Sequence, residues 1–141
     1  MANHINYIKA TRIANATAAG VTAINCTSVD MQDFEGVQAT CSMGTLTAGQ
    51  VTSLKAQSST DNSTWADITG AVTANAADGD SNKMLILDLY RPQQRYVRFV
   101  VNRATQNAVI DAVVAYQYGP KKAAVTQDAT TTSTSKLFIG I

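Results

Sequence analysis

The most constraining feature of the chain is a pair of strand-like runs joined by a short polar connector, within the segment Leu89–Lys122. Both runs are rich in Val, Tyr, Phe and Ile, which favour strands, and residues 102–107 between them are mostly polar. A sequence of this kind predicts a β-hairpin. The segment contains no nucleophilic side chain paired with a general base and no cluster of metal ligands. It therefore indicates a scaffold rather than a reactive site.

The predicted hairpin also has a register. If its turn lies between Ala104 and Thr105, Arg98 faces Asp111 on one side of the two strands. The other side is then apolar, and its facing pairs are Phe99 with Ile110, Val97 with Ala112, and Val101 with Ala108. We therefore expect Arg98 and Asp111 to form a structural cross-strand pair.

Further strand-like segments follow at short spacing, and no segment has a convincing helical pattern. In residues 84–90, leucines at every second position alternate with Met84, Ile86, Asp88 and Tyr90, so we expect this strand to lie inside a sheet. Seven to eight antiparallel strands without helices favour an all-β fold, namely a β-sandwich. The strand-like segments are 21–27, 36–43, 51–58, 65–69, 84–90, 95–102 and 108–118.

The two ends of the chain differ in composition from its middle. Residues 1–19 are rich in Ala, Asn and Thr with scattered apolar side chains, and the chain becomes rich in Ala, Thr and Ser after Pro120. We therefore expect an extended N-terminal arm (1–19), a β-sandwich domain (20–120) and an extended C-terminal arm (121–141).

The C-terminal arm ends in an apolar patch, Lys136–Ile141, which a free tail would have reason to avoid. A tip that docks onto a partner, for example by adding a strand to a sheet, explains the patch. The alternative is a tail that returns as another strand of its own sandwich. The candidate contacts between chains are large apolar residues of both arms: Ile5, Tyr7, Ile8, Leu137, Phe138 and Ile139.

Sparse charge limits the partners that the chain can have. Only 15% of residues are charged and the net charge is +1, which favours packing against neighbours but is also typical of a plain uncharged β-domain. We expect no nucleic acid partner, because Arg91, Arg95, Arg98 and Arg103 alternate across strand faces and form no basic stripe. We also expect no membrane partner, because no apolar run approaches the roughly 20 residues of a span and the N-terminus has no signal core.

The two cysteines, Cys26 and Cys41, would face each other in a simple hairpin but would be separated in a sandwich that sends their strands into different sheets. Since the chain shows no export signal, we expect reduced and partly buried thiols rather than a disulfide.

Reactive side chains do not converge in the sequence. The single histidine, His4, lies in the expected N-terminal arm, and together with two distant cysteines it does not match a zinc site. We therefore expect no enzyme activity, no metal and no cofactor. Trp65 leaves a carbohydrate-binding sandwich as an alternative, because a lone indole can stack on a sugar ring, although we favour a place in the core beside Leu54 and Ile68.

Three short signatures give the chain a family resemblance: Tyr90-Arg91-Pro92, Arg95-Tyr96-Val97-Arg98 and Tyr118-Gly119-Pro120. With their neighbours, over about residues 20–122, they resemble the capsid decoration (cement) proteins of tailed phages. The resemblance implies a jelly-roll-like β-sandwich without catalysis. It also implies a protein made in the host cytoplasm that attaches as a homodimer to the outer surface of the virion head and clamps neighbouring major capsid protein subunits. A carbohydrate-binding module of a virion is the alternative function.

Overall fold

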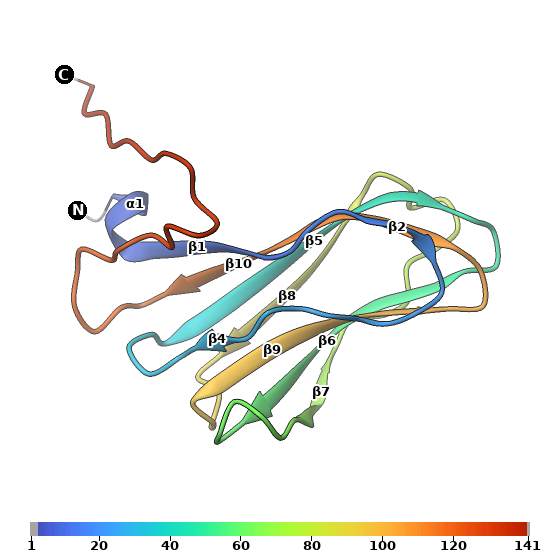
Figure 1. Cartoon of the computed structure of the whole chain (residues 1–141), viewed down its shortest axis with the longest axis horizontal. Coiled ribbons are helices and arrows are strands. Elements are labelled where there is room, and N and C mark those ends of the chain that lie inside the picture. Colours follow the sequence, from blue (N-terminus) through green and yellow to red (C-terminus); the bar gives the residue numbers. More distant parts are fainter. Residues whose placement is uncertain (1–2, 141) are drawn as a thin grey trace.

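The computed structural model describes residues 3–140, in which ten strands form two antiparallel sheets of five strands each (Figure 1). The expected all-β sandwich is thereby confirmed. The elements are α1 (His4–Tyr7), β1 (Ile8–Ala14), β2 (Thr17–Gly20), β3 (Ile24–Asn25), β4 (Val29–Asp30), β5 (Gly36–Leu46), β6 (Val51–Ser59), β7 (Ala66–Val72), β8 (Met84–Tyr90), β9 (Tyr96–Ala104) and β10 (Ala108–Tyr118).

The chain passes from one sheet to the other at most of its connections. Sheet A has the order β1-β10-β5-β8, with β2 also paired to β10, and sheet B has the order β3-β9-β6-β7, with β4 also paired to β9. Among the described strands, β6 and β7 are the one consecutive pair that is hydrogen-bonded together. Figure 1 shows the two sheets meeting at one end, where β5 leads into β6 and β9 leads into β10.

The predicted hairpin of β9 with β10 is wrong. Strand β9 pairs with β6, which places Phe99 beside Ala56, whereas β10 pairs with β5 and β1 in the other sheet. The connector of residues 105–107 is short enough for a hairpin, but the chain turns there from sheet B to sheet A, with Thr105 at a φ of 72°. Phe99 and Ile110 are both fully buried in the core between the sheets.

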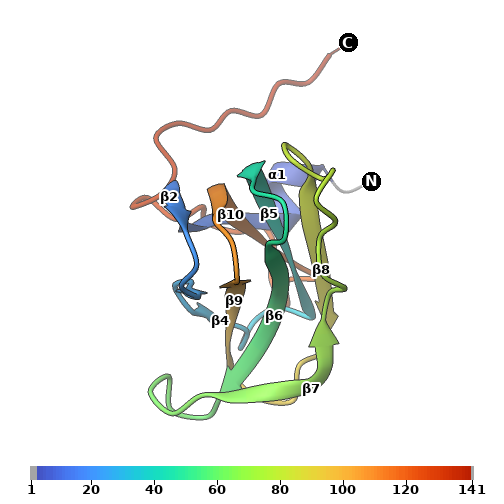
Figure 2. The same cartoon turned by 90° about the vertical axis from the view of Figure 1, so that its right-hand side faces the viewer.

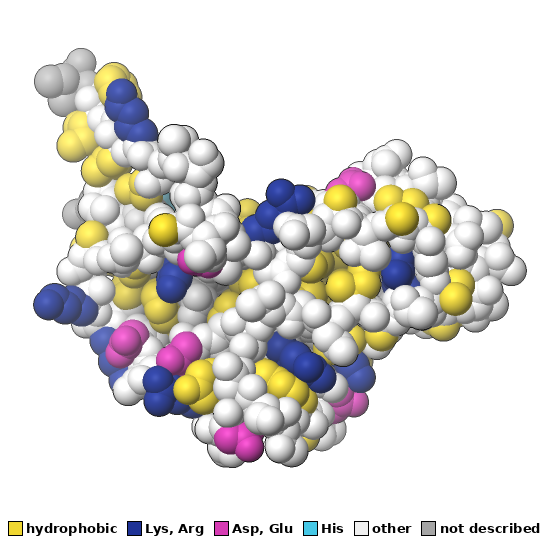
Figure 3. All heavy atoms as spheres, viewed as in Figure 1, with side chains coloured by type: hydrophobic (Ala, Val, Ile, Leu, Met, Phe, Trp, Pro, Cys, Tyr) yellow, Lys and Arg dark blue, Asp and Glu magenta, His cyan; other side chains and the backbone are white. Residues whose placement is uncertain are grey.

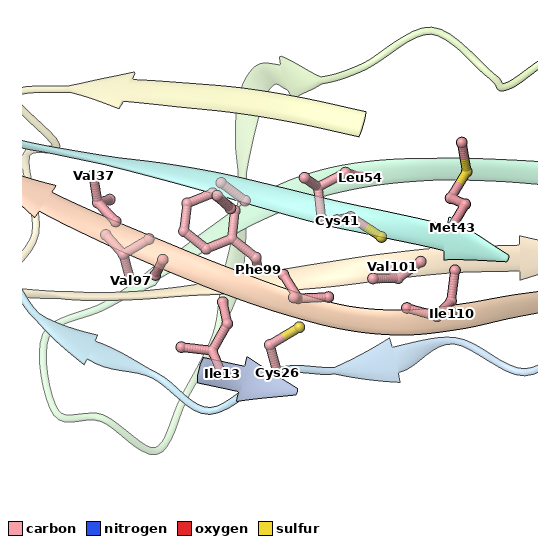
Figure 4. Packing of buried hydrophobic residues seen from close by; sticks show 14 of the residues in the cluster. Ile13, Cys26, Val37, Cys41, Met43, Leu54, Val97, Phe99, Val101 and Ile110 are labelled. Carbon is pink, nitrogen blue, oxygen red and sulfur yellow. The ribbon is translucent and has the colours of Figure 1, made fainter. Parts of the chain in front are cut away.

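Side chains from both sheets fill the space between them (Figure 4). The inward positions alternate along each strand, so Val37 and Cys41 of β5 share the core with Val97 and Phe99 of β9. This alternation leaves the opposite residues of each strand on the outer surfaces of the sandwich. The pattern of burial therefore defines two outer faces, one for each sheet.

Cys41 lies in sheet A, whereas Cys26 directly follows β3 of sheet B, and both thiols are free and buried, as the sequence predicted. Cys41 lies on β5, and the backbone amide of Cys26 donates to the carbonyl of Phe99 on β9 at 2.9 Å. Burial is the main cause that raises the pKa of each thiol to about 12. Both thiols therefore stay protonated at neutral pH.

Two strand assignments differ from the expectation. Residues 8–19, which we placed in an N-terminal arm, form β1 and most of β2 along β10. The expectation that β8 lies inside a sheet is wrong, because β8 pairs with β5 alone and forms the edge of sheet A. Apolar residues at both parities of β8 indicated cover on both faces, yet Met84, Ile86 and Tyr90 are exposed.

Candidate binding surfaces

The outer face of sheet A is a broad surface with few charges. Its residues follow from the register, because each lies between inward-facing core residues of the same strand. Of the fifteen residues in register, Arg12 and Asp88 are charged, and Asp111 adds a third charge to this face at the register shift of β10. The residues are Ile8, Ala10 and Arg12 on β1; Ala112, Val114, Tyr116 and Tyr118 on β10; Gly36, Gln38, Thr40 and Ser42 on β5; and Met84, Ile86, Asp88 and Tyr90 on β8.

This outer face contains a shallow hollow, because β5 presents short side chains between the larger ones of β8 and β10. Met84 is 58% exposed and Ile86 is 51% exposed, although both are large apolar residues. The residues that line the hollow are His4, Ile8, Gln38, Thr40, Met84, Ile86, Tyr116 and Tyr118. The hollow is therefore an unpartnered and mainly apolar surface.

Tyr118 and Gly36 form one end of the hollow. The hydroxyl of Tyr118 donates to Oδ1 of Asp88 at 2.6 Å, so the carboxylate on this face already has a partner. Burial, followed by the hydrogen bond to Asp88, raises the pKa of the Tyr118 hydroxyl, which keeps it protonated as a donor. A Cβ at Gly36 would lie 2.3 Å from the Tyr118 ring, so glycine allows the ring to lie across β5.

The outer face of sheet B is different, because it carries a network of polar and charged side chains. Nζ of Lys55 lies 3.0 Å from a carboxylate oxygen of Asp67, and Gln57 donates to the same carboxylate at 2.8 Å. The hydrogen bond from Gln57 is the main cause that lowers the pKa of Asp67. Lys55, Gln57 and Asp67 bind one another, so these polar groups of sheet B are already partnered within the chain.

Trp65 lies at this surface and not in the core, so the favoured interpretation of Trp65 as a core residue is wrong. The guanidinium carbon of Arg98 lies 4.8 Å from the centre of the Trp65 ring. Arg98 therefore occupies one face of the indole that a sugar would need for stacking. Trp65 lies after the end of β6, in the polar turn that leads into β7.

The predicted pair of Arg98 and Asp111 does not form. Nε of Arg98 donates to Oε1 of Gln57 at 2.7 Å on the outer face of sheet B. Asp111 is exposed on β10 and lies beside Gly44 on the outer face of sheet A. The two side chains are on opposite surfaces of the sandwich, because β9 and β10 belong to different sheets.

The other three arginines of the group are also engaged. Arg91 contacts Glu35 at 3.3 Å, and Arg95 contacts Asp30 at 2.9 Å. Arg103 is buried and donates to the backbone carbonyls of Ala18, Thr22 and Ala108. These guanidinium groups bind within the chain at separate places, so they do not form a continuous basic patch.

The first half of the C-terminal segment is fixed along the edge of β1. The side-chain amide of Gln127 donates to the carbonyls of Ile8 at 2.7 Å and Ile5 at 3.2 Å, and its oxygen accepts from the amide of Ala10 at 3.0 Å. The amide of Val125 donates to the carbonyl of Asn6 at 3.0 Å. The structure thus places the candidate residues Ile5 and Ile8 against the tail of the same chain. We call the three hydrogen bonds of Gln127, to Ile5, Ile8 and Ala10, the Gln127 clamp.

The second half of the tail projects from the body (Figures 1 and 2). Leu137 is 42% exposed, Phe138 is 79% exposed and Ile139 is 70% exposed. Tyr7, in α1, is exposed as well. Figure 3 shows hydrophobic side chains along the projecting tail. Through residue 140 the tail forms no strand, so it does not complete its own sandwich, and the docking of its tip stays a prediction.

No cluster of potential metal ligands is found in residues 3–140. Within this part of the chain, three or more His, Cys, Asp or Glu side chains do not come together as potential metal ligands. His4 is exposed in α1, at the rim of the hollow. No helix in the same residues has the length and hydropathy to cross a membrane.

Comparison with known proteins adds no name to these surfaces. No protein-family model matches the chain, and no curated protein is significantly similar to it in sequence. The hollow on sheet A was not predicted from the sequence. Its available signal was the apolar character of Met84 and Ile86 on the side of β8 opposite the leucines.

Proposed function

We propose that this chain is a structural virion protein that decorates the outside of an icosahedral phage head. It stabilises the head by clamping neighbouring major capsid protein subunits, and it acts as a homodimer. The observation that carries the proposal is the presence of two unpartnered apolar surfaces, the hollow on sheet A and the tail tip. The signatures around Tyr90, Tyr96 and Tyr118 supply the link to decoration proteins.

The strand order also supports a jelly-roll winding. The orders β1-β10-β5-β8 and β3-β9-β6-β7 arise when a folded-back ribbon of strands is wrapped so that its successive pairs enter opposite sheets. This winding brings β1 and the segment around Gln127 to the same edge of sheet A, where the Gln127 clamp holds them together. One edge of the molecule can therefore present residues of both terminal segments to a neighbour.

The proposed mechanism is stabilisation by mass action. A protein that binds the assembled shell and not its separated subunits stabilises the shell by RT ln(1 + [L]/Kd), about 2.7 kcal/mol per site at a 100-fold excess over Kd. Each copy needs only a modest apolar contact, because many copies act on one shell. The tail tip serves this mechanism through the homodimer, because burial of Phe138 and Ile139 on a second copy removes apolar area from water and links two shell contacts in one unit.

The test uses phage heads assembled without this protein and a truncated chain that ends at Thr132. The truncation keeps the Gln127 clamp and removes the exposed tip. We expect the full chain to co-sediment with the heads and to raise their resistance to heat, and we expect the truncated chain to lose at least about tenfold in affinity.

A Val72→Asp variant is the control, because Val72 is an apolar residue that is 50% exposed on β7 of sheet B. This variant should bind heads like the full chain. Equal head binding by the truncated and full chains would remove the tip from the mechanism. Failure of the full chain to bind heads at all would refute the proposed function.

A further inference from the structure

We propose that the hollow on the outer face of sheet A receives the tail tip, residues 137–139, of a second copy of this chain, so that two copies exchange tails. This proposal deepens the homodimer of the proposed function by naming its contact surfaces. It does not need a phage head, and it can be tested in the absence of one.

The two surfaces match in chemistry. The tip carries Leu137, Phe138 and Ile139, and the hollow offers Met84 and Ile86 at similar exposure. After Asp128 the tail has one charged side chain, Lys136, and the hollow is lined by uncharged residues and His4. A contact between them removes apolar area from water without burying an unpaired carboxylate or guanidinium group.

The base of the tail is fixed, and this determines where the tip can go. The Gln127 clamp holds the tail at β1, and the hydroxyl of Thr131 accepts from the amide of Arg12 at 3.4 Å. From there the tail points away from sheet B and from its own sandwich in both views (Figures 1 and 2). A second copy that faces this side of the molecule meets the tip.

A two-fold axis makes the contact reciprocal, because each copy then offers a tail to its partner and receives one in return. The hollow extends from Ile8 on β1 to Met84 and Ile86 on β8, and the Gln127 clamp fixes the tail at Ile8. The tail of each copy thus leaves the body from one border of the face that carries the hollow. One symmetric arrangement uses all four apolar surfaces of the pair.

The area is at the lower limit for a specific dimer. The exposed parts of Leu137, Phe138 and Ile139 amount to on the order of 350 Å² per tail, and the shallow hollow loses less than this. Two reciprocal contacts therefore bury roughly 1,000 Å² in total, which is the lower limit of specific interfaces. A single tail in the hollow of its own chain would bury about half as much.

The experiment pairs two single-cysteine additions, Phe138→Cys and Ile86→Cys, made in separate proteins and then mixed and oxidised without phage heads. A disulfide between the two variants can form only between chains. The native Cys26 and Cys41 are buried and free, so they stay out of the reaction. We expect a covalent dimer that contains one copy of each variant, detected on a non-reducing gel and by mass spectrometry.

The matched control replaces Ile86→Cys with Val72→Cys, which is 50% exposed but lies on sheet B. We expect at least about tenfold less mixed dimer with this control. Each variant oxidised alone gives the background. Equal yields from the two mixtures, or no mixed dimer with Ile86→Cys, would overturn the proposal.

A chain that carries both Phe138→Cys and Ile86→Cys tests whether the hollow instead receives the tail of the same chain. A disulfide within one chain, in place of the dimer, would assign the hollow to the tail of the same molecule and would also overturn the proposal. Head binding by the unmodified protein is measured separately. If the protein binds heads but gives no mixed dimer, the proposed function stands and the dimer contact is refuted. If it gives the mixed dimer but does not bind heads, the dimer contact stands and the proposed function is refuted.

Discussion

Phe99 shows how strongly one residue couples the two sheets. It is fully buried on β9, and its ring packs in the core between the sheets. We expect Phe99→Ala to lower the free energy of unfolding by about 3–5 kcal/mol, because a large cavity remains. Urea denaturation measures this change. The control Val72→Ala, at an exposed site, should stay within about 0.5 kcal/mol. A small effect of Phe99→Ala would mean that the core is not closed around this ring.

The two thiols give a prediction about pH. Burial raises the pKa of Cys26 and Cys41 from 9.0 to about 12, so the native thiols keep their protons above the pH at which unfolded thiols lose them. The native state then binds more protons than the unfolded state between about pH 9 and 12, and stability falls as pH rises through this window.

Thiol alkylation followed by mass spectrometry measures the protection of the two native thiols that causes this pH dependence. At about pH 9 the native protein should react far more slowly than a free peptide thiol, and both cysteines should react at once in urea. Rapid alkylation of Cys41 in the native protein would contradict its burial on β5. The same measurement on the Phe99→Ala variant should show faster labelling, because its core opens more often.

At the scale of elements, Gln127 holds the tail to β1 with one side chain. We expect Gln127→Ala to accelerate hydrogen exchange at the amides of Ala10 and Val125 by at least about tenfold, because each lost hydrogen bond contributes about 1 kcal/mol. The stability of the sandwich should not change by more than about 0.5 kcal/mol. Gln93→Ala, at an exposed glutamine in the loop after β8, is the control. Unchanged exchange would show that the clamp does not hold the tail.

The sequence predicted most strands but not their partners. Alternation identifies the side of a strand that faces a core, and residues 97–101 and 108–115 do face one. Two strands that face each other across a sandwich show the same alternation as two strands that pair in a hairpin. A three-residue connector fits both arrangements, so the error in the register of Arg98 and Asp111 followed from a pattern that does not encode hydrogen-bonded neighbours.

The candidate surfaces were predictable to different degrees. The apolar tip, Leu137–Ile139, stands out in a Thr-rich and Ser-rich tail, and the structure leaves it exposed. The hollow depends on strands from four parts of the chain that come together only through sheet order. Trp65 could not be placed from the sequence either, because its position depends on Arg98 of a strand that is distant in the chain.

At the scale of the whole molecule, the two faces of the sandwich differ in charge. Sheet B carries ion pairs such as Lys55 with Asp67, and the hollow on sheet A has none. The net charge of +1 gives little long-range attraction or repulsion. Such a molecule can turn the outer face of sheet A toward its partners. The outer face of sheet B, which is polar and internally paired, then faces solvent.

This division of charge predicts the salt dependence of both proposed contacts. Raising NaCl from about 0.05 M to about 0.5 M should change the dissociation constants of the dimer and of head binding by less than about twofold, because hydrophobic contacts are not screened. Ammonium sulfate should strengthen both contacts. Sedimentation velocity measures the dimer, and co-sedimentation measures head binding.

The control for this measurement is Lys55→Ala, which removes an ion pair from sheet B and should leave both contacts unchanged. Weakening by tenfold or more in NaCl, which corresponds to about 1.4 kcal/mol, would place the contacts at charged groups instead. Exposed residues at the ends of β8 and β10, such as Arg91 and Lys121, would then be the first candidates. Because those residues lie outside the hollow, their substitution would separate an electrostatic contact from the apolar one that the tail and sheet A offer.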